Sequence, residues 1–247
     1  MSSVSYCSDK GMVRNNNQDK YYISKDQSFF IVADGMGGHN GGECASTMAT
    51  EIISTCIESS ELHEDKIEEI LGMAIARANK LIYSAACKNE DLKEMGTTAL
   101  VCCVFKNKGY FANVGDSRAY IINSAEIHQI TIDHSVVGEL LLSGSISSEE
   151  ASVHPQKNMI TRAVGTESSV IVDIFTVEIS KGDVILLCTD GITNMVSENE
   201  IFSAVSNGAD ARLLVGIANK NGGRDNSTAI IIKDVFEESN SLVGEGD

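Results

Sequence analysis

Three apolar runs in this chain each end at an aspartate beside a glycine, in the segments FFIVADG, GYFANVGD and VILLCTDG. Short apolar runs bounded by glycine are typical of buried strands, and glycine lets backbone or ligand approach closely. The three aspartates are Asp34, Asp116 and Asp190, while Asp19 (in RNNNQD) and Asp225 (in RDNST) stand in similar polar segments. A fold built on these strands therefore places several carboxylates at strand ends.

Carboxylates in this arrangement predict a site for hard cations. Mg²⁺ and Mn²⁺ prefer carboxylate, carbonyl and water oxygens, and two such ions about 3.5–4 Å apart activate water against a phosphate ester. The first hypothesis is therefore metal-dependent hydrolysis of a phosphate.

The composition restricts the partners of the protein. A length of 247 residues suffices for one well-buried domain, and an apolar fraction of 43% is ordinary for a globular protein. The formal charge of -16 argues against nucleic acid and against an anionic membrane surface, because both are bound through Lys and Arg. A phosphate site in so acidic a protein needs cations that reverse the local field, which agrees with bound metal.

The cysteines and the N-terminus indicate a cytoplasmic protein. The seven cysteines include no CxxC pair, so we expect reduced core residues and neither disulfides nor a zinc framework. The N-terminal MSSVSYCSDK lacks a basic segment followed by an apolar one, and no run approaches the ~18 apolar residues of a membrane span. We therefore expect no signal peptide and no contact with a membrane.

The pattern of apolar residues predicts strands interrupted by helices. Alternating or short apolar runs predict strands at residues 19–24, 28–34, 97–106, 109–114, 117–123, 170–179, 183–189 and 227–234. Helical stripes predict two long helices over 45–56 and 67–85, and capped shorter helices at 135–142, 197–205 and 211–219. Helices packed against an antiparallel sheet follow from this order.

Three connecting segments have their own signatures. Gly115-Asp116 joins two predicted strands and is typical of a hairpin turn. Residues 138–156 are polar and lack strand alternation, so we expect a surface flap. We expect residues 1–235 to form a single domain and the acidic residues 236–247 to be a disordered tail.

The ordered set of motifs resembles a known family. The segments VRNNNQD, VADGMGGHNGGE, MGTTAL, NVGDSRAY, TIDHS, HPQKNMITRAVG, LLCTDGITNMV and GGRDNSTAIII are together similar to the metal-dependent Ser/Thr protein phosphatases of the type 2C (PPM) family, as a bacterial-type, single-domain member. The match runs from about residue 5 to 232. The resemblance implies an α+β fold, a four-layer α/β/β/α sandwich of two antiparallel sheets flanked by helices, with metals in a cleft at one end.

The resemblance assigns the metal ligands. Asp34 matches the aspartate that bridges two metals, and Gly35 matches the residue whose backbone carbonyl binds one of them. Asp190 and Asp225 match two further carboxylates of the first metal position. Asp34 and Asp225 also have an ordinary interpretation as turn formers beside glycine or asparagine. Without the motif that follows it, Asp34 would be better explained as a turn former. A buried, unpaired carboxylate at Asp190 would be costly, and a metal resolves that cost.

Three more residues complete the implied site. Asp19 matches an acidic residue that holds a metal-bound water, and Asp116 matches a ligand of a third, weaker metal site together with Asp190. For Asp116 a plain turn has nearly equal weight. Arg14 matches the arginine that grips the substrate phosphate, for which a planar guanidinium is suited.

The chain departs from the family pattern at two positions. Gln18 stands where Glu is more frequent and keeps only a hydrogen-bonding role. Met36 stands where eukaryotic members often have the histidine that protonates the leaving group, and His39 is more typical of a loop-stabilising residue, so we expect metal-bound water to supply that proton. Arg118 and Arg162 are expected to be structural, pairing with carboxylates that support the cleft.

The resemblance and the residues together predict the function. We expect hydrolysis of phosphoserine and phosphothreonine in proteins by water activated on two Mn²⁺ or Mg²⁺ ions, without a covalent intermediate. A cysteine-dependent phosphatase is disfavoured because no Cys begins the CxxxxxR loop that such enzymes use. The alternative is a catalytically silent module that binds phosphoproteins or a kinase. The expected partners are phosphoproteins and, by family analogy, a cognate Ser/Thr kinase. The chain is expected to be a monomer.

Overall fold

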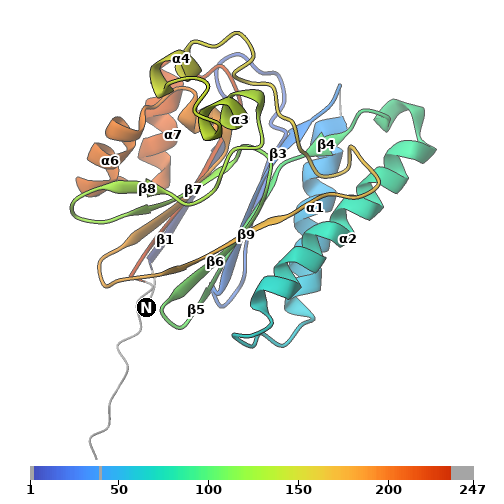
Figure 1. Cartoon of the computed structure of the whole chain (residues 1–247), viewed down its shortest axis with the longest axis horizontal. Helices are drawn as coiled ribbons and strands as arrows, with labels where there is room; N and C mark the ends of the chain where they lie inside the picture. The colour runs from blue at the N-terminus through green and yellow to red at the C-terminus, as the bar shows by residue number, and fades with distance from the viewer. Residues whose placement is uncertain (1–2, 39–40, 235–247) are drawn as a thin grey trace, which may run out of the picture.

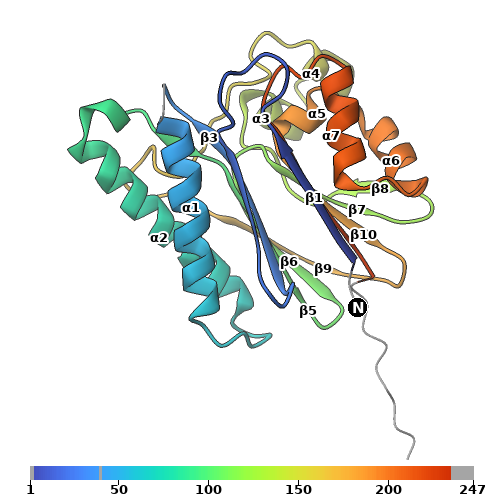
Figure 2. The ribbon, with the colours of Figure 1, turned by 180° about the vertical axis from the view of Figure 1, so that it is seen from behind.

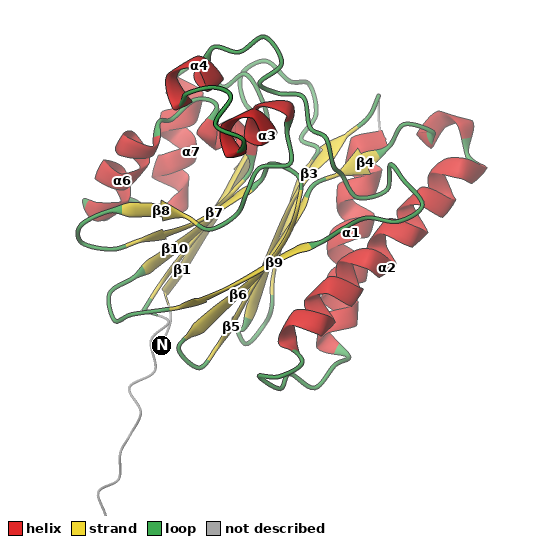
Figure 3. Cartoon of the chain, in the orientation of Figure 1, coloured by secondary structure: helices red, strands yellow, loops and turns green. Residues whose placement is uncertain are grey.

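Two antiparallel sheets pack face to face, and helices cover the outer face of each sheet (Figures 1 and 3). The computed structural model describes residues 3–38 and 41–234. Within them the predicted α+β, four-layer sandwich is confirmed. The disordered tail predicted at 236–247 and the loop residue His39 lie outside the described residues.

The first sheet has the strand order β1-β11-β10-β7-β8. Its strands are β1 (Ser3–Asp9), β7 (Arg118–Ile122), β8 (Ile127–Gln129), β10 (Val184–Cys188) and β11 (Ser227–Lys233). The second sheet has the order β2-β3-β5-β6-β9, and a short β4 pairs with β3. Its strands are β2 (Asp19–Ile23), β3 (Phe29–Met36), β4 (Gly96–Thr97), β5 (Ala99–Phe105), β6 (Lys108–Val114) and β9 (Asp173–Glu178). Neighbouring strands in both sheets are antiparallel.

The helices form two outer layers and one surface flap (Figure 2). Two long helices, α1 (Gly41–Glu58) and α2 (Ile67–Lys88), cover the second sheet and are followed by a short 3-10 turn, η1 (Glu90–Leu92). Three helices cover the first sheet: α5 (Asp190–Thr193), α6 (Glu198–Ser206) and α7 (Ala211–Lys220). The flap contains α3 (Val136–Leu142) and α4 (Ser148–Ser152), and it lies with α5 at one end of the sandwich.

The apolar residues divide into three packed layers because successive side chains of a strand point to opposite faces. In β3, Ile31 packs against α1 and α2, whereas its neighbours Phe30 and Val32 pack between the two sheets. In β10, Leu186 likewise faces the helices and Leu187 faces the other sheet. Both faces of these strands are therefore buried, which explains their continuous apolar runs.

One predicted connection is wrong. Gly115-Asp116 does not form a hairpin, because β6 belongs to the second sheet and β7 to the first. Both edges of β6 are occupied, by β5 and β9, so no edge is left for β7 to pair with. The segment instead crosses between the sheets, with Gly115 at a φ of 111° that favours glycine.

Other differences concern short or half-exposed elements. The edge strand β1, the short β8 and the one-turn α5 were not predicted. The caps predicted for the shorter helices are present, at Ser135, Ser197 and Asp210, and each side chain accepts a hydrogen bond from a backbone N–H of the first turn.

The predicted core position of the cysteines is correct for Cys102, Cys103 and Cys188 but wrong for Cys87, which is exposed. All seven thiols are free, as expected. No described helix is long and apolar enough to span a membrane.

Candidate metal and phosphate site

The predicted site residues come together from both sheets around one cleft of about 620 Å³. Asp34 lies near the end of β3, Asp190 begins α5 directly after β10, and Asp225 precedes β11. Asp116 lies in the crossover between β6 and β7. The cleft is lined by these four aspartates together with Arg14, Gln18, Gly35, Met36, Gly37, Gly38, Thr98, Asn158, Met159, Ile160 and Asn226.

Asp19 lies beside this cleft, in the strand next to Asp34. The register of β2 and β3 pairs Asp19 directly with Asp34, and Asp19 is only 2% exposed. The structure thus brings all six predicted metal residues and the predicted phosphate-binding arginine to one end of the sandwich.

The backbone around Asp34 and Gly35 is fixed on both sides. Thr98 accepts a hydrogen bond from the Asp34 N–H (2.9 Å) and donates its own N–H to the Asp34 carbonyl (2.8 Å). On the other side, Gly35 contacts Gly42 in the first turn of α1 so closely that a Cβ on either glycine would collide with the backbone of the other. Both glycines are required by this contact, which holds the Gly35 peptide in place.

Two buried carboxylate oxygens in the site lack a partner. Asp19 Oδ1 and Asp190 Oδ1 have no hydrogen-bond partner within the described part of the chain, although the second oxygen of each is hydrogen-bonded. Buried polar atoms are normally satisfied, so such atoms need an explanation. Oxygens left open beside a cleft fit a divalent cation of the Mg²⁺ or Mn²⁺ type.

Burial and, to a smaller degree, mutual repulsion raise the pKa values of the carboxylates. Burial, and then the charges of Asp19 and Asp190, hold the pKa of Asp34 well above its usual range. Burial raises the pKa of Asp19 to about 7 and that of Asp116 to about 8, and the Asp190 charge adds to both. Burial and the Asp225 charge also raise the pKa of Asp190. Four acidic groups that repel one another need a cation to be ionised together at neutral pH.

Side-chain ligands alone do not form a complete cage. Among residues 3–38 and 41–234, no three His, Cys, Asp or Glu groups stand close enough together to hold a metal ion. Mg²⁺ typically keeps several waters and uses one or two carboxylates, so this spacing suits a hydrated ion better than an enclosed one. The donor set fits the implied metals on that basis.

Arg14 lies at the mouth of the cleft, where its guanidinium donates to Asp225 Oδ2 at 2.7 Å. More than half of the Arg14 side chain is exposed. The loop that contains Arg14 is tied to the Asp225 loop by Asn226, which accepts from the Gln18 N–H and donates to the carbonyls of Lys10 and Asn16. The arginine is therefore available to a ligand that enters from solvent.

Asp116 is positioned through a histidine that the sequence analysis did not single out. The Nδ1 of the buried His134 accepts a hydrogen bond from the Gly115 N–H (3.0 Å), and the backbone N–H of His134 donates to the Gly115 carbonyl (3.0 Å). Its Nε2 lies 3.0 Å from Asp173. This clamp fixes the crossover that presents Asp116 to the cleft.

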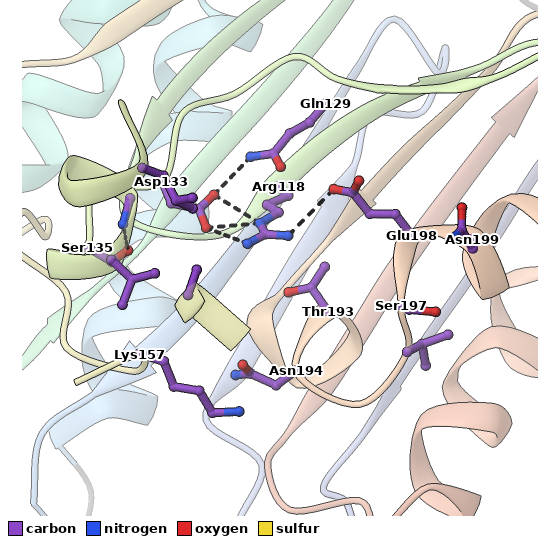
Figure 4. A pocket seen from close by; sticks show the side chains of 15 residues that line it. Arg118, Gln129, Asp133, Ser135, Lys157, Thr193, Asn194, Ser197, Glu198 and Asn199 are labelled. Atoms are coloured by element: carbon purple, nitrogen blue, oxygen red, sulfur yellow. Dashed lines mark hydrogen bonds and ion pairs between the residues drawn. The ribbon is translucent and has the colours of Figure 1, made fainter. Parts of the chain in front are cut away.

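Arg118 and Arg162 pair with carboxylates, as predicted. Arg118 binds both oxygens of Asp133 in a neighbouring pocket of about 530 Å³ (Figure 4), and Arg162 donates to Asp173 at 2.7 Å. Met36, which was expected at a position occupied by histidine in eukaryotic relatives, lines the cleft. None of the described residues that line the cleft is a histidine.

Several functional neighbours were missed from the sequence. Thr98, Asn194, Thr189, Thr228 and Asn226 each hydrogen-bond to a predicted ligand or to its loop. Four of these residues stand in or near the segments TDG and DN of the sequence. Their hydrogen-bond partners, however, depend on strand pairing that no local pattern reveals.

Comparisons with known proteins agree with this geometry. The model of the protein phosphatase 2C family matches residues 12–212. The serine/threonine phosphatase Stp of Listeria welshimeri is 41% identical over 234 residues, covering 91% of this chain and 93% of that protein. The structure of the serine/threonine phosphatase Stp1 from Staphylococcus aureus has a TM-score of 0.89 at 36% identity and covers 95% of both chains.

A second structure bears on the metals. The catalytic domain of the serine/threonine phosphatase PstP, in complex with two manganese ions, has a TM-score of 0.84 at 30% identity and covers 94% of this chain and 97% of that one. The fold, the gathered carboxylates and these similarities lead to one conclusion: the chain belongs to the protein phosphatase 2C family of metal-dependent Ser/Thr protein phosphatases.

Proposed function

We propose that this phosphatase acts through two Mn²⁺ or Mg²⁺ ions bound in the cleft between the sheets, with Asp34 as the shared ligand. The Gly35 carbonyl, Asp190 and Asp225 would be the other protein ligands, and Asp19 would hold a water of the bound ion. Asp116 and Asp190 form a third, weaker metal site. The observation that supports this assignment is the convergence of these carboxylates on one cleft, where two buried oxygens stay unsatisfied.

The ions, when bound, supply a water of lowered pKa and offset the phosphate charge. The residues of the chain bind the phosphate and position the site. Arg14 binds the phosphate at the mouth of the cleft, where its fork can engage two oxygens. Asp34 and Asp190 hold the reaction centre against the rigid ends of β3 and β10. The substrate is a phosphoserine or phosphothreonine of another protein, and water attacks it directly without a covalent phosphoenzyme; a cysteine-dependent route is disfavoured because none of the described residues that line the cleft is a cysteine.

Three further proposals concern the cellular setting. A cognate Ser/Thr kinase is the expected source of the substrates, by family analogy. The protein is proposed to act as a monomer in the cytoplasm, and its free thiols support a reducing compartment.

Release of inorganic phosphate from phosphothreonine peptides tests the assignment. Activity should require Mn²⁺ or Mg²⁺ and should disappear in Asp34→Asn and Asp225→Asn, whereas Asp133→Asn, a carboxylate outside the cleft, should retain metal dependence. Turnover by Asp34→Asn at the wild-type rate would overturn the ligand assignment. Peptide binding without phosphate release would instead support the silent module.

A further inference from the structure

Asp19 is held by two buried hydroxyls that come from the opposite sheet. Thr189 Oγ1 lies 2.8 Å and Thr228 Oγ1 lies 2.7 Å from the same oxygen, Asp19 Oδ2. Both threonines are fully buried. Thr189 follows β10 and Thr228 lies in β11, while Asp19 begins β2 of the other sheet. These hydrogen bonds therefore join the two sheets at the site.

The direction of each hydrogen bond follows from its neighbours. Thr189 Oγ1 accepts the backbone N–H of Thr228 at 2.9 Å, so its own proton points to Asp19. Asn17 Nδ2 donates to Ser8 Oγ at 2.9 Å, and Ser8 Oγ lies 2.8 Å from Thr228 Oγ1. Ser8 can then donate to Thr228, and Thr228 donates to Asp19. Both threonines thus act as donors, and Asp19 Oδ2 is an acceptor only.

This arrangement decides which oxygen of Asp19 stays open. The terminal torsion of an aspartate is broad and nearly two-fold, so the carboxylate by itself does not fix its orientation. Two donors on Oδ2 remove that freedom. The other oxygen, Oδ1, is buried and has no hydrogen-bond partner among the described residues.

We infer that Thr189 and Thr228 are positioning residues that fix the Asp19 carboxylate so that Oδ1 is presented to the metal site. They touch neither substrate nor metal and act through Asp19. The inference rests on the proposed role of Asp19 in metal binding. Outer residues that orient metal ligands typically change affinity by about 10- to 100-fold when mutated.

Manganese titration by calorimetry tests the inference on the full chain. Thr228→Val keeps the shape of the side chain and removes the hydroxyl, and it should weaken Mn²⁺ binding by about 10-fold. Thr228→Ser restores the hydroxyl and should restore affinity to nearly the wild-type value. The matched control is Thr131→Val, because Thr131 is equally buried and accepts the Ala119 N–H at 3.1 Å, away from the cleft.

A double-mutant cycle separates positioning from a loss of stability. In an Asp19→Ala background, Thr228→Val should weaken Mn²⁺ binding no further, because the side chain through which it acts on the metal has been removed. Equal weakening in both backgrounds, or unchanged affinity in Thr228→Val, would overturn the inference. Thr189→Val provides the second variant should Thr228→Val fail to fold by circular dichroism. Absence of Mn²⁺ binding by the wild-type protein would overturn the proposed metal site itself.

Discussion

Replacement of Gly42 by alanine should weaken metal binding from outside the ligand set. A Cβ at Gly42 would lie 2.6 Å from the carbonyl oxygen and 2.7 Å from the carbonyl carbon of Gly35. Ordinary contacts begin near 3.4 Å, so either the first turn of α1 or the Gly35 peptide must move by several tenths of an ångström. Because the Gly35 carbonyl is a proposed ligand and Mg²⁺ demands near-ideal geometry at 2.0–2.1 Å, a shift of this size is not tolerated.

The size of the stability change follows from two opposing terms. Overpacking of a close contact costs about 1–3 kcal/mol, and alanine in a helix gains at most about 1 kcal/mol over glycine. The net loss of about 0–2 kcal/mol corresponds to a melting temperature lower by up to about 8 °C for a chain of this length. Affinity for Mn²⁺ should fall by at least about 10-fold, as for other changes that disturb a ligand.

Two glycines serve as matched controls for Gly42→Ala. At Gly72, in α2, a Cβ meets nothing within 4 Å, so Gly72→Ala should raise the melting temperature and leave Mn²⁺ affinity unchanged. At Gly41 the nearest atom is Met95 Cβ at 3.2 Å, a contact that can relax. Calorimetric titration measures the Mn²⁺ affinity of the three variants, and thermal melts measure their stability. Wild-type affinity in Gly42→Ala, or equal losses in Gly41→Ala, would refute the reasoning.

Four other predictions follow from the cleft. Chelation by EDTA should abolish phosphatase activity, and Mn²⁺ or Mg²⁺ but not Ca²⁺ should restore it, because Ca²⁺ prefers longer and looser coordination; full turnover in excess EDTA rules this out. Asp34→Ala and Asp190→Ala should keep the fold and lose more than about 90% of kcat, a loss of at least ~1.4 kcal/mol of barrier stabilisation; circular dichroism and steady-state rates check both. Arg14→Ala should raise KM for phosphopeptides and lower kcat. Its Mn²⁺ affinity should be kept or increased, since a cation beside Asp225 is removed. Kinetics rescued by extra metal alone would contradict this. In EDTA, the melting temperature should fall as pH rises from about 5 to 8. Burial raises the pKa of Asp19 to about 7 and of Asp116 to about 8, so the native state binds more protons than the unfolded state in that window. A flatter pH profile of the melting temperature in Asp116→Asn checks the assignment.

The sequence allowed the central strands and the aspartates at their ends to be predicted, because both leave a local signature. Apolar runs marked β3 and β10, and the glycine beside Asp34 and Asp190 marked where each run ends. The edge strand β1 was missed because it pairs only with β11 and half of its residues are polar. Its sequence therefore lacks the continuous apolar run of a strand that is buried on both faces.

The partners of the ligands could not be predicted, because they depend on pairing between distant strands. In the sequence, the segment STAIII indicates only that Thr228 lies in a strand. Only the antiparallel register of β10 and β11, with Cys188 opposite Ala229, brings it beside Thr189. The prediction of a hairpin at Gly115-Asp116 was wrong for the same reason. A local turn pattern does not reveal that both edges of β6 are already paired with other strands.

The division of the site between two sheets has a mechanical consequence. Asp19, Asp34 and Gly35 belong to strands of the second sheet, whereas Asp190 and Asp225 flank strands of the first. The separation of the two ligand groups is therefore set by the residues packed between the sheets, among them Phe30, Phe111 and Leu187. Protein cores are close-packed and transmit strain, so a change of volume in this layer alters the spacing of the carboxylates as well as the stability. If the proposed ligands bind metal, we expect substitutions in the inter-sheet core to change metal affinity as well as stability.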